Sequence, residues 1–99
     1  MAILSSKVNT RDEQYTANYE SMQVVVDDLQ EKAAQIHQGG GPKYQERHLS
    51  RGKLLPRDRI NKLLDAGSPF LEVGQFAAWD CYEDYVPSAG VVAGIGQVE

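Results

Sequence analysis

The sequence predicts an α+β fold in which a long helix and a second helix precede two or three strands. Apolar residues recur at steps of four and three over residues 11–38, which is the spacing of one helix face. A shorter helical pattern runs from Pro56 to Gly67, and residues 70–73 and 90–98 are rich in strand-forming side chains. At 99 residues and 11.0 kDa, the chain is one small domain at most.

The first element is the long helix expected over about residues 11–38. Thr10 followed by Glu13 fits a capping box at its start, and a glycine run followed by Pro42 ends it. Its apolar stripe consists of Tyr15, Tyr19, Met22, Val26, Leu29, Ala33 and Ile36. The flanking positions carry little charge, which favours docking on a larger protein body over a self-pairing coiled coil. His37 is expected to be a helix-end residue and not a metal ligand.

The second half of the chain begins with a short helix expected over residues 42–50. The clear second helix starts at Pro56, because proline suits a first turn, and stops at Gly67. Its buried edge is expected to consist of Ile60, Leu63 and Leu64. Residues 74–88 are expected to form a loop around a possible short strand. The aromatic side chains expected to anchor that loop are Trp79, Tyr82 and Tyr85.

The last predicted strand, residues 90–98, combines β-branched residues with glycines. Gly94 and Gly96 are expected to allow a bend or a close approach of two backbones. The strand stops without a following turn or partner, and unpaired strands expose open edges. The sequence is therefore expected to be the front of a longer protein, cut near a hairpin turn.

Charge is distributed unevenly around a net charge of −4. Residues 47–62 hold six bases against one acid, between a stretch of net charge −3 and a stretch of −6. The bases are Arg47, Arg51, Lys53, Arg57, Arg59 and Lys62. Such a block indicates an anion site, a solvated helix face, or bases that pair with acids such as Asp58 or Asp65. A nucleic-acid partner is disfavoured, since the rest of the chain is acidic and no aromatic residues interleave with the bases.

Several classes of site and location are disfavoured by the residues. One cysteine, Cys81, allows no disulfide framework and no thiolate cluster, and a buried or inert thiol is expected. His37 and His48 have no acid or cysteine at metal-ligand spacing. No apolar run is long enough to cross a membrane, and the first residues do not resemble a signal or transit peptide. We expect a cytoplasmic protein with no membrane contact.

Residues 50–76 resemble the N-terminal region of the carboxyltransferase (β) subunits of biotin-dependent acyl-CoA carboxylases. The resemblance is carried by Arg51-Gly52-Lys53-Leu54, Arg57-x-Arg59-Ile60, Leu63-Leu64-Asp65, Gly67-Ser68 and Phe70-Leu71-Glu72. Residues 89–96 resemble the first long strand of that family. Leu55-Pro56, Pro69 and residues 36–41 are similar to the methylcrotonyl-CoA branch of the family.

The resemblance implies the N-terminal segment of a crotonase-like (ClpP/crotonase) carboxyltransferase domain. Residues 1–41 are then an extended N-terminus with the long helix, and residues 42–99 are the truncated start of the domain. The implied reaction moves a carboxyl group from carboxybiotin to 3-methylcrotonyl-CoA in leucine catabolism. A propionyl- or geranyl-CoA carboxylase is the alternative within the family, and a non-enzymatic helical interaction module is the alternative outside it.

The resemblance also implies cofactors and partners. Biotin is carried by a partner subunit, the biotin carboxylase/biotin carrier α subunit, which uses ATP and bicarbonate, and the β subunits form a homo-oligomer. Coenzyme A carries phosphates, for which Arg51 and Lys53 are the candidate contacts, with Arg47 behind them. The family's oxyanion-hole elements lie beyond residue 99, so no catalytic residue is expected here and the chain alone is expected to be inactive.

Overall fold

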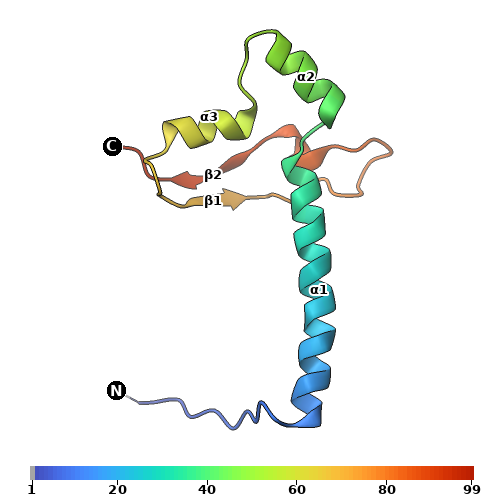
Figure 1. Ribbon diagram of the computed structural model, residues 1–99, viewed down its shortest axis with the longest axis vertical. Helices are drawn as coiled ribbons and strands as arrows, with labels where there is room; N and C mark the ends of the chain where they lie inside the picture. The colour runs from blue at the N-terminus through green and yellow to red at the C-terminus, as the bar shows by residue number, and fades with distance from the viewer. Residues whose placement is uncertain (1) are drawn as a thin grey trace. The chain divides into compact units, whose positions relative to one another are not determined.

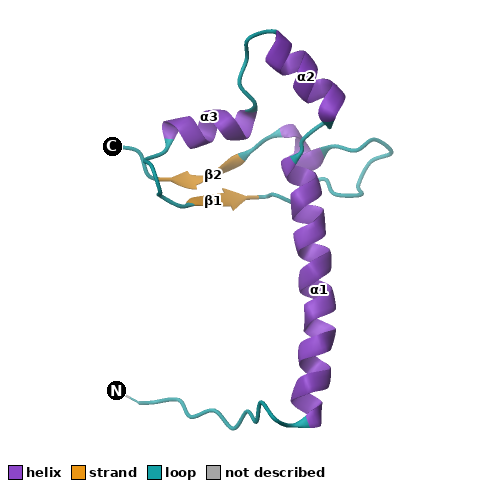
Figure 2. Cartoon of the chain, in the orientation of Figure 1, coloured by secondary structure: helices purple, strands orange, loops and turns teal. Residues whose placement is uncertain are grey.

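A computed structural model describes residues 2–99 and confirms the α+β class, with three helices and two strands in that part of the chain (Figures 1 and 2). The elements are α1 (Glu13–His37), α2 (Pro42–Ser50), α3 (Pro56–Leu63), β1 (Phe70–Val73), the 3-10 helix η1 (Pro87–Gly90) and β2 (Ala93–Gly96). The chain divides into two compact units, residues 1–32 and 33–99. The expected domain limit between residues 41 and 42 stays a prediction, and Met1 lies outside the described residues.

Helix α1 confirms the long helix, but its start differs from the expected one. The helix begins at Glu13, so Thr10 lies too early to cap it and the capping-box prediction is wrong. The turn before the helix is held instead by the Asn9 side chain, whose Oδ1 accepts a hydrogen bond from the Arg11 N–H at 3.1 Å. Side-chain pairs one turn apart support the exposed helix surface, including Lys32 with Asp28 at 2.7 Å.

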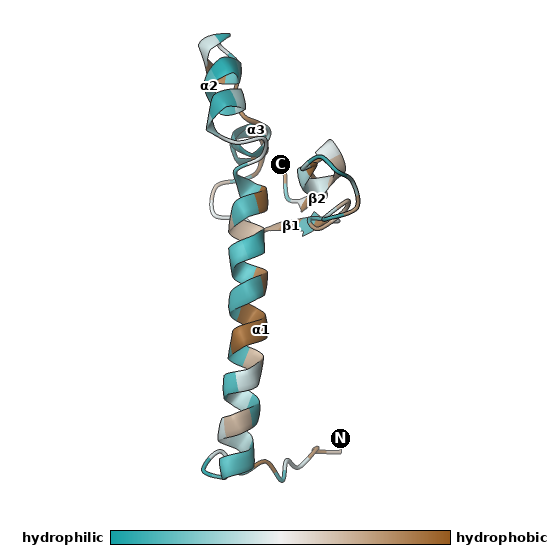
Figure 3. Cartoon of the chain, turned by 90° about the vertical axis from the view of Figure 1, so that its right-hand side faces the viewer, coloured by the Kyte–Doolittle hydropathy of each residue, from teal (hydrophilic) through white to brown (hydrophobic). Residues whose placement is uncertain are grey.

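The apolar stripe of α1 is buried at only one end. Ile36 is 2% exposed, whereas Met22 is 60% exposed and Leu29 is 51% exposed. Figure 3 shows hydrophobic residues along α1. Ile36 belongs to the unit of residues 33–99, and it is the one hydrophobic side chain of the described residues that is fully buried. The core of this unit is therefore small.

Helices α2 and α3 begin at Pro42 and Pro56, as expected. Helix α3 ends at Leu63, because Leu64 already has extended backbone angles. The expected stop at Gly67 is wrong, because Gly67 lies in the turn that follows the helix and has a φ of +76°. In this turn the Ser68 N–H donates a hydrogen bond to the Asp65 carbonyl at 3.0 Å. The predicted buried edge is also corrected at Leu63, which is 66% exposed.

The two strands form an antiparallel pair in which Phe70 lies opposite Gly96 and Val73 opposite Ala93. The last strand is shorter than expected and is paired, which corrects the prediction of an unpaired terminal strand. The close approach expected at the glycines is confirmed. A Cβ on Gly94 would overlap the Phe70 ring and the Leu71 carbonyl, and one on Gly96 would overlap Leu64.

Residues 74–86 form turns, with no strand in this described segment. Two of the three predicted aromatic anchors are confirmed: the Trp79 ring packs edge-on against Tyr85, and the Tyr85 hydroxyl donates to the Gln35 carbonyl at 3.2 Å. Tyr82 is 69% exposed and forms no aromatic pair with the described rings, so its predicted role as an anchor is not confirmed. Cys81 is exposed, so of the two expectations, a buried or an inert thiol, the buried one is wrong.

Candidate functional site

The three candidate CoA-binding bases follow one another from the end of α2 into the next loop. Arg47 lies in the last turn of α2, Arg51 caps that helix, and Lys53 follows in the loop. All three are exposed, and none forms an ion pair with another described residue. Their charges are therefore available to an anion.

Local hydrogen bonds fix the loop that carries these bases. Gly52 has a φ of +71°, which favours glycine, and its N–H donates to the Leu49 carbonyl at 2.9 Å. The half-buried His48 ring lies 2.9 Å from the Leu54 carbonyl through Nε2, so this nitrogen is the donor. The Arg51–Lys53 segment is thus held between a closed helix end and a fixed side-chain contact.

Arg57 of the same basic block has a structural partner. Its guanidinium donates two hydrogen bonds to Glu72 of β1, at 2.5 and 2.7 Å. Both side chains are largely buried, with 23% of Arg57 and 12% of Glu72 exposed. Of the alternatives for the basic block, pairing with an acid is therefore confirmed for Arg57, but the partner is Glu72 and not Asp58 or Asp65. Sequence reasoning missed Glu72, although a strand in which Phe70 and Glu72 share one face signals an acid that needs a partner.

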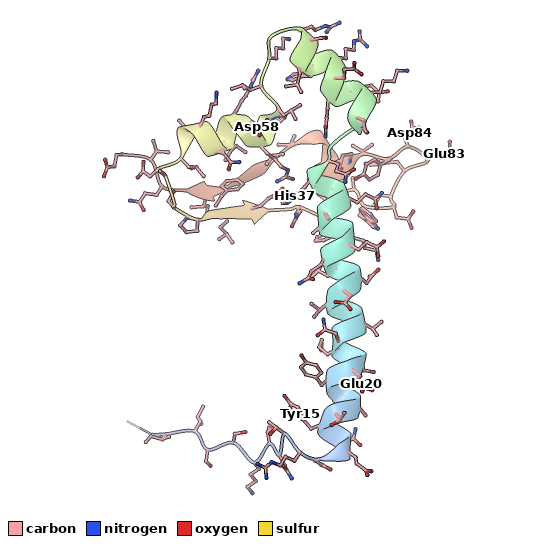
Figure 4. The ribbon with its side chains drawn as sticks, in the orientation of Figure 1. Tyr15, Glu20, His37, Asp58, Glu83 and Asp84 are labelled. Carbon is pink, nitrogen blue, oxygen red and sulfur yellow. The ribbon has the colours of Figure 1, made fainter. Side chains whose placement is uncertain are left out.

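His37 completes this cluster from the end of α1 (Figure 4). Its Nε2 lies 3.7 Å from a Glu72 oxygen, so Glu72 connects the end of α1, α3 and β1. The hydrogen bonds from Arg57 lower the pKa of Glu72 below its ordinary value of 4.5, while burial raises it and the charges of Arg57 and His37 lower it further. The cluster stabilises an ionised carboxylate.

An open groove of about 450 Å³ lies among the end of α1, α2 and the start of α3. Its lining residues are His37, Gln38, Gly39, Gly40, Tyr44, Gln45, His48, Leu55, Pro56, Arg57 and Asp58. The three candidate bases are not among them, and sequence reasoning did not predict this groove. The helical spacing of Tyr44 and His48, with prolines and glycines bounding α2, was the signal available for it.

No group of three metal-ligating side chains occurs among residues 2–99, and the pairs described above contain no nucleophile activated by a base. None of the helices in the described part of the chain is long and apolar enough to cross a membrane.

Comparison with known proteins identifies the family to which more than half of the chain belongs. Residues 47–99 match the carboxyl transferase domain family. The chain is 47% identical over 97 residues to the probable methylcrotonoyl-CoA carboxylase beta chain, mitochondrial, of Drosophila melanogaster. That alignment covers 97% of this chain and 17% of the fly protein. The chain thus spans about a sixth of the length of this curated relative.

Solved structures of similar proteins include the following two. The beta subunit of P. aeruginosa geranyl-CoA carboxylase has a TM-score of 0.82 at 29% identity, covering 96% of this chain and 18% of that subunit. Transcarboxylase 12S, described as a hexamer assembly with methylmalonyl-coenzyme A bound, has a TM-score of 0.68 at 38% identity, covering 78% of this chain and 16% of that one. The expected fold, part of a crotonase-like carboxyltransferase domain, is confirmed.

Proposed function

Because this chain belongs to the carboxyl transferase domain family, we propose that it is the amino-terminal part of the carboxyltransferase (β) subunit of a biotin-dependent acyl-CoA carboxylase. The complete subunit transfers a carboxyl group from carboxybiotin to 3-methylcrotonyl-CoA, a step of leucine catabolism. The observation that carries this proposal is the 47% identity to a probable methylcrotonoyl-CoA carboxylase beta chain over 97% of the chain. Residues 1–41 supply the N-terminal helix, residues 42–99 begin the catalytic domain, and the 99 residues alone are inactive.

Within this proposal, the basic residues at the end of α2 and in the loop after it bind the phosphates of CoA. Arg51 and Lys53, with Arg47 behind them, are exposed bases without an acidic partner among the described residues. Arginine and lysine side chains form charge-assisted hydrogen bonds to phosphate oxygens. The fixed loop between α2 and α3 reduces the conformational entropy lost when they bind.

Biotin is the cofactor of the proposed reaction, and it reaches the subunit on a partner. That partner is the biotin carboxylase/biotin carrier α subunit, where ATP and bicarbonate are used, and the β subunits form a homo-oligomer. The residues described here include no candidate for holding biotin. They bind and orient the acyl-CoA, while carboxybiotin supplies the carboxyl group when it is delivered.

The location and the other partners are a further part of the proposal. The protein is cytoplasmic, with no membrane and no nucleic-acid partner. The fly relative is named as mitochondrial, whereas the geranyl-CoA carboxylase subunit is bacterial. A fusion of the complete protein to a fluorescent reporter in its own host tests the cytoplasmic location.

One alternative substrate is favoured by a specific observation. The geranyl-CoA carboxylase subunit matches 96% of the chain with a TM-score of 0.82, but its sequence identity is only 29%. A propionyl-CoA carboxylase is the other alternative. The non-enzymatic helical module loses its basis, because residues 47–99 belong to the carboxyl transferase domain family.

Competing thioesters test the substrate. We expect the complete holoenzyme to have a higher kcat/KM for 3-methylcrotonyl-CoA than for geranyl-CoA or propionyl-CoA at one pH and bicarbonate concentration. A hydrophobic pocket discriminates by about 1–3 kcal/mol per methylene, so some side activity accompanies the preferred substrate. A ratio that favours either other thioester contradicts the assignment to 3-methylcrotonyl-CoA.

A paired substitution tests the phosphate contacts. Replacing Arg51 and Lys53 together with alanine should raise the KM for acyl-CoA more than it lowers kcat, because contacts remote from the reacting carbon supply uniform binding. Lys7 and Arg11, which are exposed bases outside the block, provide the matched double-alanine control. An unchanged KM with a lower melting temperature contradicts the proposed role of Arg51 and Lys53.

A further inference from the structure

Residues 75–89 form a loop whose two ends are bonded to each other. The Ser88 hydroxyl donates a hydrogen bond to the Gln75 carbonyl at 3.2 Å, and the Ala89 N–H donates one to the Ala77 carbonyl at 2.9 Å. The chain thus leaves β1 and returns to the same place before β2 begins (Figures 1 and 2). Compact surface loops with adjoining ends, called Ω-loops, span about 6–16 residues and are frequently functional.

The backbone of this loop is strained. Among the described residues, every residue other than glycine that has a positive φ lies in the loop. These residues are Ala78 (+61°), Asp80 (+54°), Ser88 (+53°) and Ala89 (+52°). Aspartate visits this left-handed conformation with little cost, but in alanine and serine the Cβ approaches the following carbonyl oxygen. Strain of this kind persists only where the surrounding contacts enforce it, and it clusters in clamps and switch regions.

Few contacts oppose this strain. Ser88 is 6% exposed and provides the buried closing bond. Within the loop, the Trp79 ring packs edge-on against Phe76 and Tyr85. The tip, residues 80–84, is exposed throughout (Figure 4). Segments with few buried contacts open locally at a lower free energy than the body of a protein, and strain that is relieved on opening favours the open state further.

One side-chain bond joins the loop to the end of α1. The Tyr85 hydroxyl donates to the Gln35 carbonyl at 3.2 Å, and this carbonyl also accepts a hydrogen bond from the Gln38 N–H at 3.2 Å. Gln35 lies in the last turn of α1, where carbonyls have no partner within the helix. The closed loop therefore caps the end of the helix beside the buried Ile36.

We propose that residues 75–89 are a strained strap, closed by the bonds of Ser88 and Ala89, which opens as a unit while β1 and β2 stay paired. Opening relieves the left-handed backbone, breaks the bond between Ser88 and Gln75, and withdraws the Tyr85 hydroxyl from the end of α1. The strap is a conformational device of the fold itself. It does not depend on which thioester the complete protein carboxylates.

Two alanine-to-glycine substitutions separate stored strain from flexibility. Ala77 and Ala89 share one hydrogen bond, but only Ala89 has a positive φ. In the complete protein, Ala89→Gly should lower the opening constant of the strap about threefold, because glycine adopts a positive φ without strain. Ala77→Gly should raise the constant about threefold, because glycine gains freedom in the open state. Hydrogen–deuterium exchange of peptides that span the strap measures both changes.

A third substitution tests the closing bond. Ser88→Ala should raise the opening constant about fivefold, because it removes the hydroxyl and keeps the strained backbone. Ser50→Ala is the matched control, since the Ser50 hydroxyl also donates to a carbonyl, that of Arg47, but lies outside the strap. Cleavage after Glu83 by a glutamate-specific protease should rank the variants in the same order, because cleavage follows the population of the open state.

The exchange of the neighbouring strands shows whether the opening is local. Peptides that cover β1 should keep their wild-type exchange in all of these variants. Shifts of the same sign for Ala77→Gly and Ala89→Gly would overturn the stored strain. An unchanged exchange of the strap in Ser88→Ala, or exchange of β1 together with the strap, would overturn the strap itself.

Discussion

The two ends of α1 carry the same apolar stripe but differ in burial. Ile36, in the unit of residues 33–99, is 2% exposed, while Leu29, two turns earlier in the unit of residues 1–32, is 51% exposed. The spacing of the stripe is regular through both. The difference teaches that helical periodicity identifies the face built for burial, whereas burial itself depends on which other elements the chain brings to that face.

The largest expected effect tests this difference directly. Ile36→Ala should lower the free energy of unfolding by about 3 kcal/mol, because it removes buried methyl groups and leaves a cavity. Leu29→Ala, a substitution on the same stripe, should change it by less than about 1 kcal/mol. Denaturant titration followed by fluorescence of Trp79, the single tryptophan, measures both. Equal effects at the two positions would show that α1 is covered along its whole length.

The next effect concerns the ion pair that holds the second unit together. Arg57→Ala should lower the free energy of unfolding by about 2 kcal/mol, because it leaves the largely buried Glu72 carboxylate without its partner. Both side chains keep some exposure to solvent, so the loss is smaller than for a fully buried pair. Arg59→Ala removes the same group from an exposed position of the same helix and should be nearly neutral. A neutral Arg57→Ala in the same titration would mean that the pair adds nothing to stability.

The close contact between β1 and β2 at Gly94 gives a smaller effect. Gly94→Ala should destabilise by about 1–2 kcal/mol, since the added methyl meets the Phe70 ring and the Leu71 carbonyl. Ile95→Ala, on the exposed face of the same strand, should cost less than about 1 kcal/mol. The melting temperatures of the two variants measure this order. A lower melting temperature for Ile95→Ala than for Gly94→Ala would contradict the register of β1 and β2.

The smallest effect is the pH dependence that Glu72 contributes. The pKa of Glu72 is lower in the folded chain than its ordinary value of 4.5, so this carboxylate binds a proton more tightly in the unfolded chain than in the folded chain. The stabilisation is therefore present above pH 4.5 and is lost as the pH falls through the folded pKa. Unfolding titrations from pH 6 to pH 3 should show a shallower acid decline for Glu72→Gln than for the wild type, with Glu83→Gln, an exposed acid, as the control.

Local sequence signals predicted the secondary structure well. Prolines predicted the starts of α2 and α3, and the strand at residues 70–73 was confirmed in full. The errors concern the ends of the helices. Helix α3 ends before Gly67, where Leu64 has extended backbone angles and its side chain lies against Gly96, a residue more than 30 positions away. Local propensity carries no information about such a contact.

The sequence by itself determined the class of the elements, the basic block from Arg47 to Lys62 and the family signature within it, because all of these are properties of neighbouring residues. Only the tertiary structure decided which bases of this block pair with an acid of the chain and which remain exposed to an anion. It paired Arg57 with Glu72 across 15 residues and left Arg47, Arg51 and Lys53 exposed. It also formed the groove beside Tyr44 from three separate helices. Burial and pairing depend on distances in space, which a pattern of local spacings does not contain.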